Sequence, residues 1–362
     1  MLEDDATAMI CLRPDFPAED VRTIIHRLDG SQALVPGFIP APAGFLRLET
    51  ITYAALIEGV QTVVMPDRNI VSRMARIART GLARPAEPTS QLAAEIMALC
   101  QTVDFDIEPS IAFHELAHRQ GNDAALEELS WFRVADQNRR QTWLDIALGR
   151  ASKLPVLSPA AEGFVDLAAP LNRWVRNYAV ALKIASLELS PLARRAKARA
   201  LFEWMVSDFI VAGPAAMFAT MYLSPRAARA RMMKHLRSPD RERALAGIRN
   251  AAWDITYLSE FVQRVKAANY NSQRFILATG DRTMAELASL LFPDIETLDG
   301  FRRILSSAIV PWWGDDAPYV AKLICDAIEV GEAREPPTSP SRNYVGDLIV
   351  AGETEIRERQ RA

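Results

Sequence analysis

Four acidic residues, widely spaced along the chain, are the side chains whose types and positions could do chemistry together. They are Asp67, Glu115, Asp254 and Asp281. Asp67 and Asp281 each follow a short apolar run, 61–65 and 274–279, that we predict to be a strand. Because ligands of open parallel sheets bind where the strands end, these two carboxylates are expected to lie close together.

The other two acids lie on predicted helices. Asp254 shares a helical stripe with Leu258 and Phe261, and that stripe is otherwise apolar. An ionised carboxylate on a buried face is costly unless it is paired or binds a metal ion. Glu115 lies on a similar, partly apolar helix face. We therefore interpret all four acids as members of one site.

Converging carboxylates repel one another and raise one another's pKa, and a divalent cation removes that penalty. Ligands that are all oxygen favour Mg²⁺ or Mn²⁺ over zinc. Such a site can activate water and stabilise the leaving oxygen of a phosphodiester. The four acids are thus predicted to be both metal ligands and catalytic residues.

Short motifs around these acids resemble those of the PIN-domain nucleases. Asp67-Arg68-Asn69 resembles the first D-x-N of that family, and Glu115-Leu116 resembles its second acidic motif. Asp254 resembles the third acid, and Thr279-Gly280-Asp281-Arg282 resembles the T-x-D after the last core strand. The resemblance covers roughly 60–120 and 246–293. It implies an endonuclease that uses Mg²⁺ or Mn²⁺ to cleave single-stranded nucleic acid, more often RNA than DNA.

The chain departs from the usual family pattern in two places. A long, mostly helical segment separates the second and third acids, and Pro66 precedes the first. Asn69 and Thr279 are secondary candidates for the site, and Glu108 competes with Glu115.

Each acid also has a purely structural interpretation. Asp67 and Asp281 could cap the helices that follow them, because aspartate accepts hydrogen bonds from the first free N–H groups of a helix. Asp254 could pair with a buried arginine.

A competing motif shares Glu115. Residues 114–118 read His-Glu-Leu-Ala-His, which matches the H-E-x-x-H pattern of zinc metallopeptidases. A third ligand is needed, and the other histidines, His26 and His235, lie far away in sequence. Asp136 or Glu128 could serve. The zinc peptidase is therefore the first alternative, and a catalytically silent PIN-like interaction module is the second.

A basic segment lies in the middle of the chain. Between Leu192 and Arg249 there are twelve Lys or Arg residues and four acids. Arg226, Arg229, Arg231 and Lys234 are the residues we predict to contact nucleic acid. A solvated helix face, or a face docked on an acidic surface, is the alternative.

The order of predicted elements indicates an α/β fold, with a PIN-like parallel sheet flanked by helices, an all-α insertion and a helical C-terminal extension. Further short strands are expected within 33–50 and 104–107. The predicted parts are 50–116 and 246–293 for the core, 117–245 for the insertion, 294–335 for the extension and 336–362 for a tail. Ser-Pro pairs at Ser190, Ser224 and Ser238 are predicted to cap the helices that follow them.

Composition adds limits but names no partner. The 362 residues carry a formal net charge of only −3, so nucleic-acid binding must come from a local patch. The three cysteines are far apart, which favours a reducing compartment, and no secretory signal is visible. The apolar run Phe209–Leu223 is predicted to be a buried helix rather than a membrane span. We expect a cytoplasmic protein, with a second copy or a protein partner bound through the insertion or the tail.

Overall fold

The computed structural model describes residues 11–155, 158–160, 163, 165–268, 272–292, 297–333 and 343–359. The chain divides into two compact units. Unit 1 contains residues 1–168 and 264–285, and unit 2 contains residues 169–263 and 286–362. Within the described ranges, no helix is both long and apolar enough to cross a membrane.

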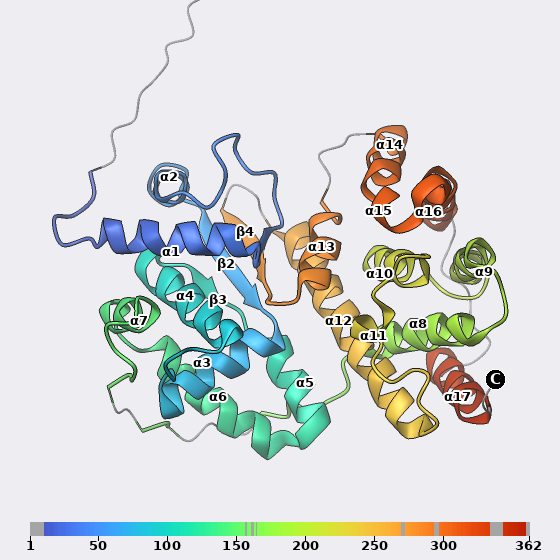
Figure 1. The fold of residues 1–362 in the computed structure, drawn as a ribbon, viewed down its shortest axis with the longest axis horizontal. Coiled ribbons are helices and arrows are strands. Elements are labelled where there is room, and N and C mark those ends of the chain that lie inside the picture. Colours follow the sequence, from blue (N-terminus) through green and yellow to red (C-terminus); the bar gives the residue numbers. More distant parts are fainter. Residues whose placement is uncertain are drawn as a thin grey trace, which may run out of the picture. The chain divides into compact units, whose positions relative to one another are not determined.

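A small sheet lies at the centre of unit 1 (Figure 1). Its strands are β1 (Leu34–Pro36), β2 (Gln61–Pro66), β3 (Asp106–Ile107) and β4 (Gln273–Ala278), in the order β1-β4-β2-β3. β2 runs parallel to β3 and β4, and Pro66 pairs with Ala278 in the register of β2 and β4. Asp67 and Thr279 therefore follow two neighbouring strands at one edge of the sheet.

The sheet is mixed rather than parallel, so the prediction of a parallel sheet is wrong for one strand. β1 pairs antiparallel with β4, with Leu34 opposite Ala278. An edge strand bonds to a single neighbour, and an antiparallel edge on an otherwise parallel sheet is common. The broader prediction of an α/β fold is confirmed, in a protein that is mostly helical.

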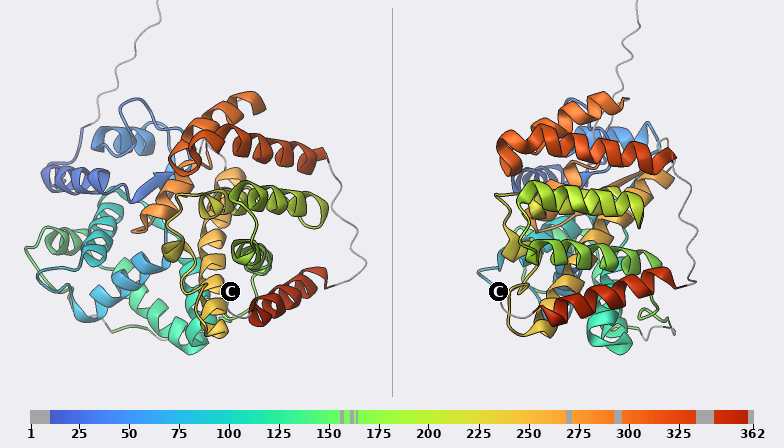
Figure 2. Two further views of the ribbon diagram at one scale, coloured as in Figure 1. Left: turned by 45° about the vertical axis from the view of Figure 1, so that its right-hand side comes forward. Right: turned by 90° about the vertical axis from the view of Figure 1, so that its right-hand side faces the viewer.

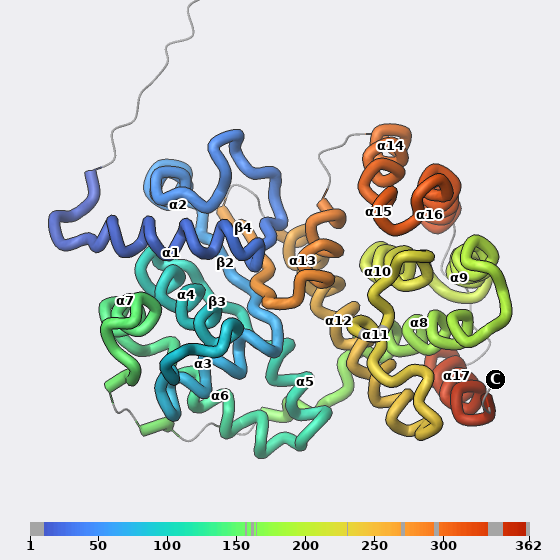
Figure 3. The backbone as a smooth tube through the Cα atoms, viewed as in Figure 1, coloured from blue at the N-terminus to red at the C-terminus, as the bar shows by residue number. Residues whose placement is uncertain are grey.

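Helices cover the sheet of unit 1. They are α1 (Ala18–Ser31), α2 (Leu48–Leu56), α3 (Arg68–Thr80), α4 (Pro88–Val103), α5 (Ser110–Gln120), α6 (Asn122–Asp136) and α7 (Arg140–Ala147). α3 packs against α4 and α6, and α4 packs against α1 and α7. Ile70, Met74 and Ile77 are spaced to lie on one face of α3, and all three are buried. Figure 3 shows the backbone passing directly from β2 into α3.

In the described residues of unit 2, every secondary-structure element is a helix or a 3₁₀ turn. These elements are α8 (Asn172–Leu189), α9 (Arg194–Ser207), α10 (Gly213–Leu223), α11 (Arg229–Met232), α14 (Leu298–Ala308), α15 (Val310–Trp313), the 3₁₀ turn η1 (Gly314–Asp316), α16 (Ala317–Ala333) and α17 (Tyr344–Glu358). α12 (Arg241–Ala267) and α13 (Arg282–Ser289) each contain residues of both units. α8 packs against α9, α10 and α17, as the views in Figure 2 also show. α10 is buried from Pro214 to Leu223, which confirms a buried helix within the predicted run Phe209–Leu223, although residues 209–212 precede it.

The unit boundaries differ from the parts predicted by the sequence. Residues 117–168 belong to unit 1, whereas the sequence analysis placed the start of the insertion at residue 117. The physical reason is the packing of α6 against α3 and α5, which joins α6 to the elements around the sheet.

The predicted tail contains a packed helix. α17 lies against α8, where the Tyr178 hydroxyl donates to Glu353 at 2.6 Å and the Ser186 hydroxyl donates to Glu355 at 2.5 Å. Ile356 is fully buried. A charged sequence therefore folds here because its acids find partners on α8; residues 336–342 and 360–362 of the predicted tail lie outside the described residues.

Two of the Ser-Pro pairs end helices instead of starting them. Ser190 is the C-cap of α8 and Ser224 is the C-cap of α10, and both have extended backbone angles. A proline disfavours the helical conformation of the residue before it, so the serine terminates the helix. At the third pair, Asp240 caps α12 by accepting from the Arg243 N–H at 3.1 Å.

Candidate functional site

Asp67 is the most deeply buried acid at the strand ends of unit 1. Its side chain is held at both oxygens: Oδ1 accepts from the Ile70 N–H at 2.9 Å, and Oδ2 accepts from the Thr279 hydroxyl at 2.5 Å. The Asp67 N–H donates to Ala278 O at 2.8 Å, which continues the ladder between β2 and β4. Asp67 therefore caps α3 and is fixed to the end of β4.

Asp281 is positioned by the same threonine. Its N–H donates to Thr279 Oγ1 at 3.0 Å. Its Oδ1 accepts from the Thr283 N–H at 2.7 Å, so Asp281 caps α13. Its Oδ2 accepts no hydrogen bond from the described residues. Asp67 and Asp281 are therefore helix caps, as the structural interpretation held. Asp281 Oδ2 has no donor among the described residues.

Glu115 is buried on α5. Its Oε1 lies 3.2 Å from an Arg119 nitrogen. Arg68 is also close enough for its charge to act on Glu115. Its guanidinium nevertheless bonds to Glu128, from Nη1 at 2.5 Å and from Nη2 at 2.9 Å. The sequence analysis missed these two arginines, but the i, i+4 spacing of Glu115 and Arg119 was a signal that could have indicated one of them.

The charges of three predicted site residues act on one another. Burial raises the pKa of Asp67, and the nearby Asp281 carboxylate raises it further, against the hydrogen bond from Thr279. Burial also raises the pKa of Glu115; the charges of Arg119 and Arg68 lower it, and that of Asp67 raises it. Strongly perturbed acids that share one location are a mark of functional sites.

Asp254 belongs to unit 2, whereas the other three acids belong to unit 1. On α12 it is half-buried, next to fully buried neighbours such as Ile255 and Leu258. Its membership of a common site stays a prediction. Within the described residues, no group of three or more His, Cys, Asp or Glu side chains has an arrangement that could hold a metal ion.

The secondary candidates have different environments. Thr279 is buried between the two acids, as the hydrogen bonds above require. Asn69 is exposed on the first turn of α3. Glu108 follows β3 and accepts from the Ser110 N–H at 3.0 Å, next to the N-cap residue Pro109 of α5.

The two histidines of the H-E-x-x-H motif lie on α5. His114 Nδ1 is 2.8 Å from Leu167 O, and His118 is exposed. Partial desolvation of its ring and the charge of His114 lower the pKa of His118, as expected for neighbours on one helix face. Of the suggested third ligands, Glu128 is bound by Arg68 and Asp136 accepts from Gln101 at 3.0 Å.

The four basic residues predicted to contact nucleic acid do not form one exposed set. Arg226, Arg231 and Lys234 are exposed, and Arg226 Nη1 lies 3.5 Å from Pro311 O. Arg229 instead points inward, bonding to Ser224 O and lying 3.6 Å from a Glu188 oxygen.

A second acidic location in unit 1 was not predicted. A pocket of about 470 Å³ beside β3 is lined by Asp104, Asp106, Asp136 and Arg264, among others. Burial and the charge of Asp106 raise the pKa of Asp136. Asp104 and Asp106 lie two residues apart at the start of β3, but Asp136 ends α6, so the sequence spacing did not indicate that it joins them.

In comparisons with known proteins, no family model, curated protein or solved structure matches this chain.

Proposed function

We propose that unit 1 is a metal-dependent endonuclease that hydrolyses phosphodiester bonds of single-stranded nucleic acid. The observation that supports this most is the placement of Asp67 beside Thr279 and Asp281, at the ends of the parallel strands β2 and β4. That edge is where open α/β sheets bind ligands. Burial and the nearby Asp281 carboxylate raise the pKa of Asp67, as expected for an acid whose charge a cation would stabilise.

The donor set suits magnesium or manganese better than zinc. Mg²⁺ is usually held by one or two carboxylates and several waters, so a cage of three protein ligands is not needed. Asp281 Oδ2 and Glu115 Oε2 accept no hydrogen bond from the described residues, and the Asp67 oxygens keep unused lone pairs. These oxygens could hold the ion.

In this proposal Asp67 and Asp281 would hold the ion, and Glu115 would orient the attacking water. A bound ion of this kind supplies a water of lowered pKa and neutralises charge on the phosphate. Thr279 fixes Asp67 and Asp281 relative to each other through one hydroxyl. The charges of Arg119 and Arg68 act against burial, which raises the pKa of Glu115.

The preference for RNA over DNA rests on the resemblance of the motifs to PIN-domain nucleases. The rival zinc peptidase rests on His114, Glu115 and His118, and needs a third ligand that the described residues do not supply. If the chain is instead a catalytically silent interaction module, it would have the same fold but would not cleave nucleic acid.

The test is cleavage of matched single-stranded RNA and DNA by the metal-stripped full chain, with Mn²⁺ added or withheld. We expect Mn²⁺-dependent cleavage that Asp281→Asn lowers by at least about 100-fold, the usual cost of losing one electrostatic contact at developing charge. Asparagine keeps a side-chain oxygen for the Thr283 N–H, so the cap of α13 survives.

Asp240→Asn is the matched control. Asp240 also caps a helix with its Oδ1 but lies in unit 2 and outside the site. It should cleave like the parent protein. Equal activity of the parent and Asp281→Asn would refute the proposal. Loss of activity in His118→Ala, together with one equivalent of bound zinc, would favour the peptidase.

A further inference from the structure

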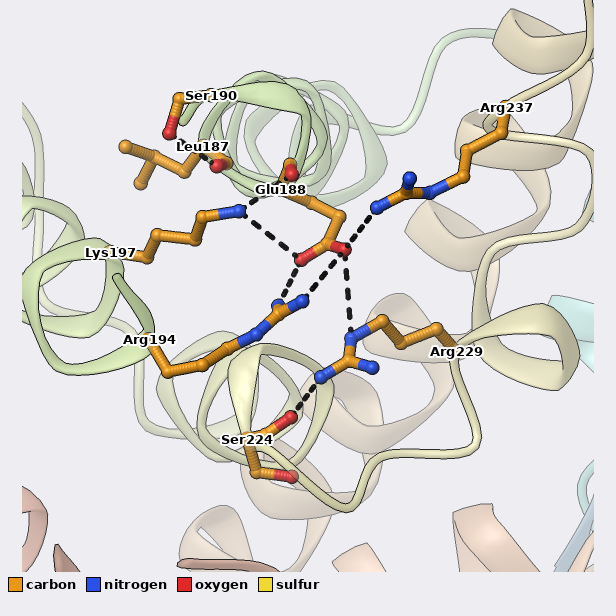
Figure 4. A network of polar contacts seen from close by, with 8 residues as sticks. All are labelled: Leu187, Glu188, Ser190, Arg194, Lys197, Ser224, Arg229 and Arg237. Carbon is orange, nitrogen blue, oxygen red and sulfur yellow. Dashed lines mark hydrogen bonds and ion pairs between the residues drawn. The ribbon is translucent and has the colours of Figure 1, made fainter. Parts of the chain in front are cut away.

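Glu188 of α8 is surrounded by four cationic side chains (Figure 4). Its side chain is only 1% exposed. Arg194 bonds directly to its carboxylate, and Arg237 lies 3.2 Å from Oε1. Arg229 Nε lies 3.6 Å from Oε1, and Lys197 Nζ lies 3.7 Å from Oε2. One carboxylate therefore faces four positive charges within unit 2.

The positive charge of this cluster is not balanced by other acids. In the described part of the chain, every ion pair of Arg194, Lys197, Arg229 and Arg237 is with Glu188. Burial lowers the pKa of Lys197, and the charges of Arg194 and Arg237 lower it further. Burial and the charge of Arg194 likewise lower the pKa of Arg229. A second anion would relieve this repulsion.

A pocket of about 650 Å³ opens beside the cluster. Its lining includes Tyr222, Arg229, Met233, Leu236 and Arg237. The buried Nε of Arg229 has no hydrogen-bond partner, although it lies near Glu188. The hydroxyl of Tyr222, a residue only 1% exposed, forms no hydrogen bond with any described residue. The Tyr222 hydroxyl thus remains available to a ligand in the pocket, whereas Arg229 Nε faces Glu188.

The size and the lining indicate the class of ligand. Pockets of about 300–1,000 Å³ are typical of small-molecule sites. A phosphate monoester carries up to two negative charges and three acceptor oxygens, so it offsets a surplus of several cations better than a carboxylate does. Met233 and Leu236 supply an apolar wall for an organic group. A bare inorganic ion would leave that wall unused.

We propose that this pocket binds a phosphate monoester of a small organic molecule, with a nucleoside monophosphate as the type of ligand that fits both its charge and its apolar wall. Arg229, Arg237 and the Tyr222 hydroxyl bind the phosphate. Met233 and Leu236 contact the organic part. Glu188 holds the cations in place, as a positioning residue.

The test is calorimetric titration of the full chain, in phosphate-free buffer, with AMP, adenosine and inorganic phosphate. We expect AMP to bind at one site, inorganic phosphate to compete with it, and adenosine not to bind. Equal binding of AMP and adenosine, or no binding of AMP, would overturn the proposal. A 5′-phosphorylated trinucleotide that binds more tightly than AMP would assign the pocket to polymer ends and would also overturn it.

Variants assign the binding to this pocket. Arg237→Gln should weaken AMP binding by about tenfold or more, since a charge-assisted contact to phosphate is lost. The Arg237 side chain is 76% exposed, so its loss leaves no large cavity. Arg199→Gln is the control, because Arg199 is exposed on α9 and pairs with Glu203 away from the cluster. Equal AMP affinity in the two variants would contradict the assignment.

Tyr222→Phe provides a second test that keeps the ring in the core. It should weaken AMP binding by about threefold or more, the value of one hydrogen bond. Asp281→Asn should bind AMP like the parent protein, so this proposal and the proposed nuclease can fail separately.

Discussion

Thr279 donates its hydroxyl proton to Asp67 across 2.5 Å, although the two residues are 212 positions apart in the chain. The same hydroxyl oxygen accepts the Asp281 N–H at 3.0 Å. One buried side chain therefore sets the positions of two acids that follow different strands. A threonine suits this role because its hydroxyl is at once a donor and an acceptor.

Replacing Thr279 should disturb both acids. Thr279→Val keeps the shape of the side chain but leaves Asp67 Oδ2 without its donor, and we expect the free energy of unfolding to fall by about 1–3 kcal/mol. Thr279→Ser keeps the hydroxyl, so its free energy of unfolding should fall less than that of Thr279→Val. Urea unfolding at pH 7 measures both. If valine and serine were equally stable, the hydroxyl would not stabilise the fold.

Asp67→Asn should change how stability depends on pH. Burial raises the pKa of Asp67 in the folded protein, so the folded state holds this proton more tightly than the unfolded state. The parent protein should therefore lose stability relative to Asp67→Asn as pH rises from about 4, where an unfolded aspartate titrates, through the raised pKa. Asparagine keeps an acceptor for the Ile70 N–H. Chemical unfolding from pH 4 to 8 without divalent ions gives the comparison. A relative gain by the parent with rising pH would show that the sign is wrong.

Glu188→Gln should destabilise unit 2 strongly. Removing one partner of a buried ion pair typically costs about 3–5 kcal/mol, and here it leaves four cations facing a neutral amide. Burial raises the pKa of Glu188, but the hydrogen bond from Arg194 and the charges of Arg194 and Lys197 outweigh this and lower it. The contribution of Glu188 should therefore be present above the unfolded pKa and be lost as pH falls through the lowered one.

The control for that variant is Glu203→Gln on α9. Glu203 forms an exposed i, i+4 pair with Arg199, and its loss should cost at most about 0.5 kcal/mol. Thermal unfolding of the three proteins at pH 7 and pH 4 provides the measurement. Equal losses in both variants would mean that the cluster contributes no more than a surface pair.

Gly247→Ala should destabilise α12 despite the better helix propensity of alanine. A Cβ at position 247 would lie 1.8 Å from the carbonyl oxygen of Lys234, a backbone atom that cannot simply rotate away. We expect a loss of about 1–3 kcal/mol from this overpacking. Gly213→Ala is the matched control, because nothing lies within 4 Å of a Cβ there. A melting temperature unchanged in Gly247→Ala would argue against this close approach.

The central part of the sheet could be predicted from sequence because its signals are local. The apolar run at 61–65 and the run at 274–279 correspond to β2 and β4, and both are followed by an aspartate that caps a helix. Strand ends and helix caps depend on a few consecutive residues. This is why Asp67 and Asp281 could be placed at the same edge of the sheet.

Features that depend on distant partners could not be predicted in this way. The direction of β1 is set by its pairing with β4, and the fold of α17 depends on hydrogen bonds from Tyr178 and Ser186 to its acids. The cations around Glu188 come from α9 and from the residues between α10 and α12. In the sequence, those cations form only a basic segment, which we interpreted as a surface for nucleic acid.

The strand order of unit 1 has a consequence for biosynthesis. β4 lies between β1 and β2, yet it is the last strand to be synthesised. At about 5–20 residues per second, a ribosome needs roughly 10–40 s to extend the chain from Asp67 to Thr279. During that time β1 lacks its only strand neighbour, and β2 can pair only with the short β3. Until residue 279 has been synthesised, the nascent chain therefore carries exposed strand edges and lacks Thr279 beside Asp67, so the acidic site can assemble only after β4 has emerged from the ribosome.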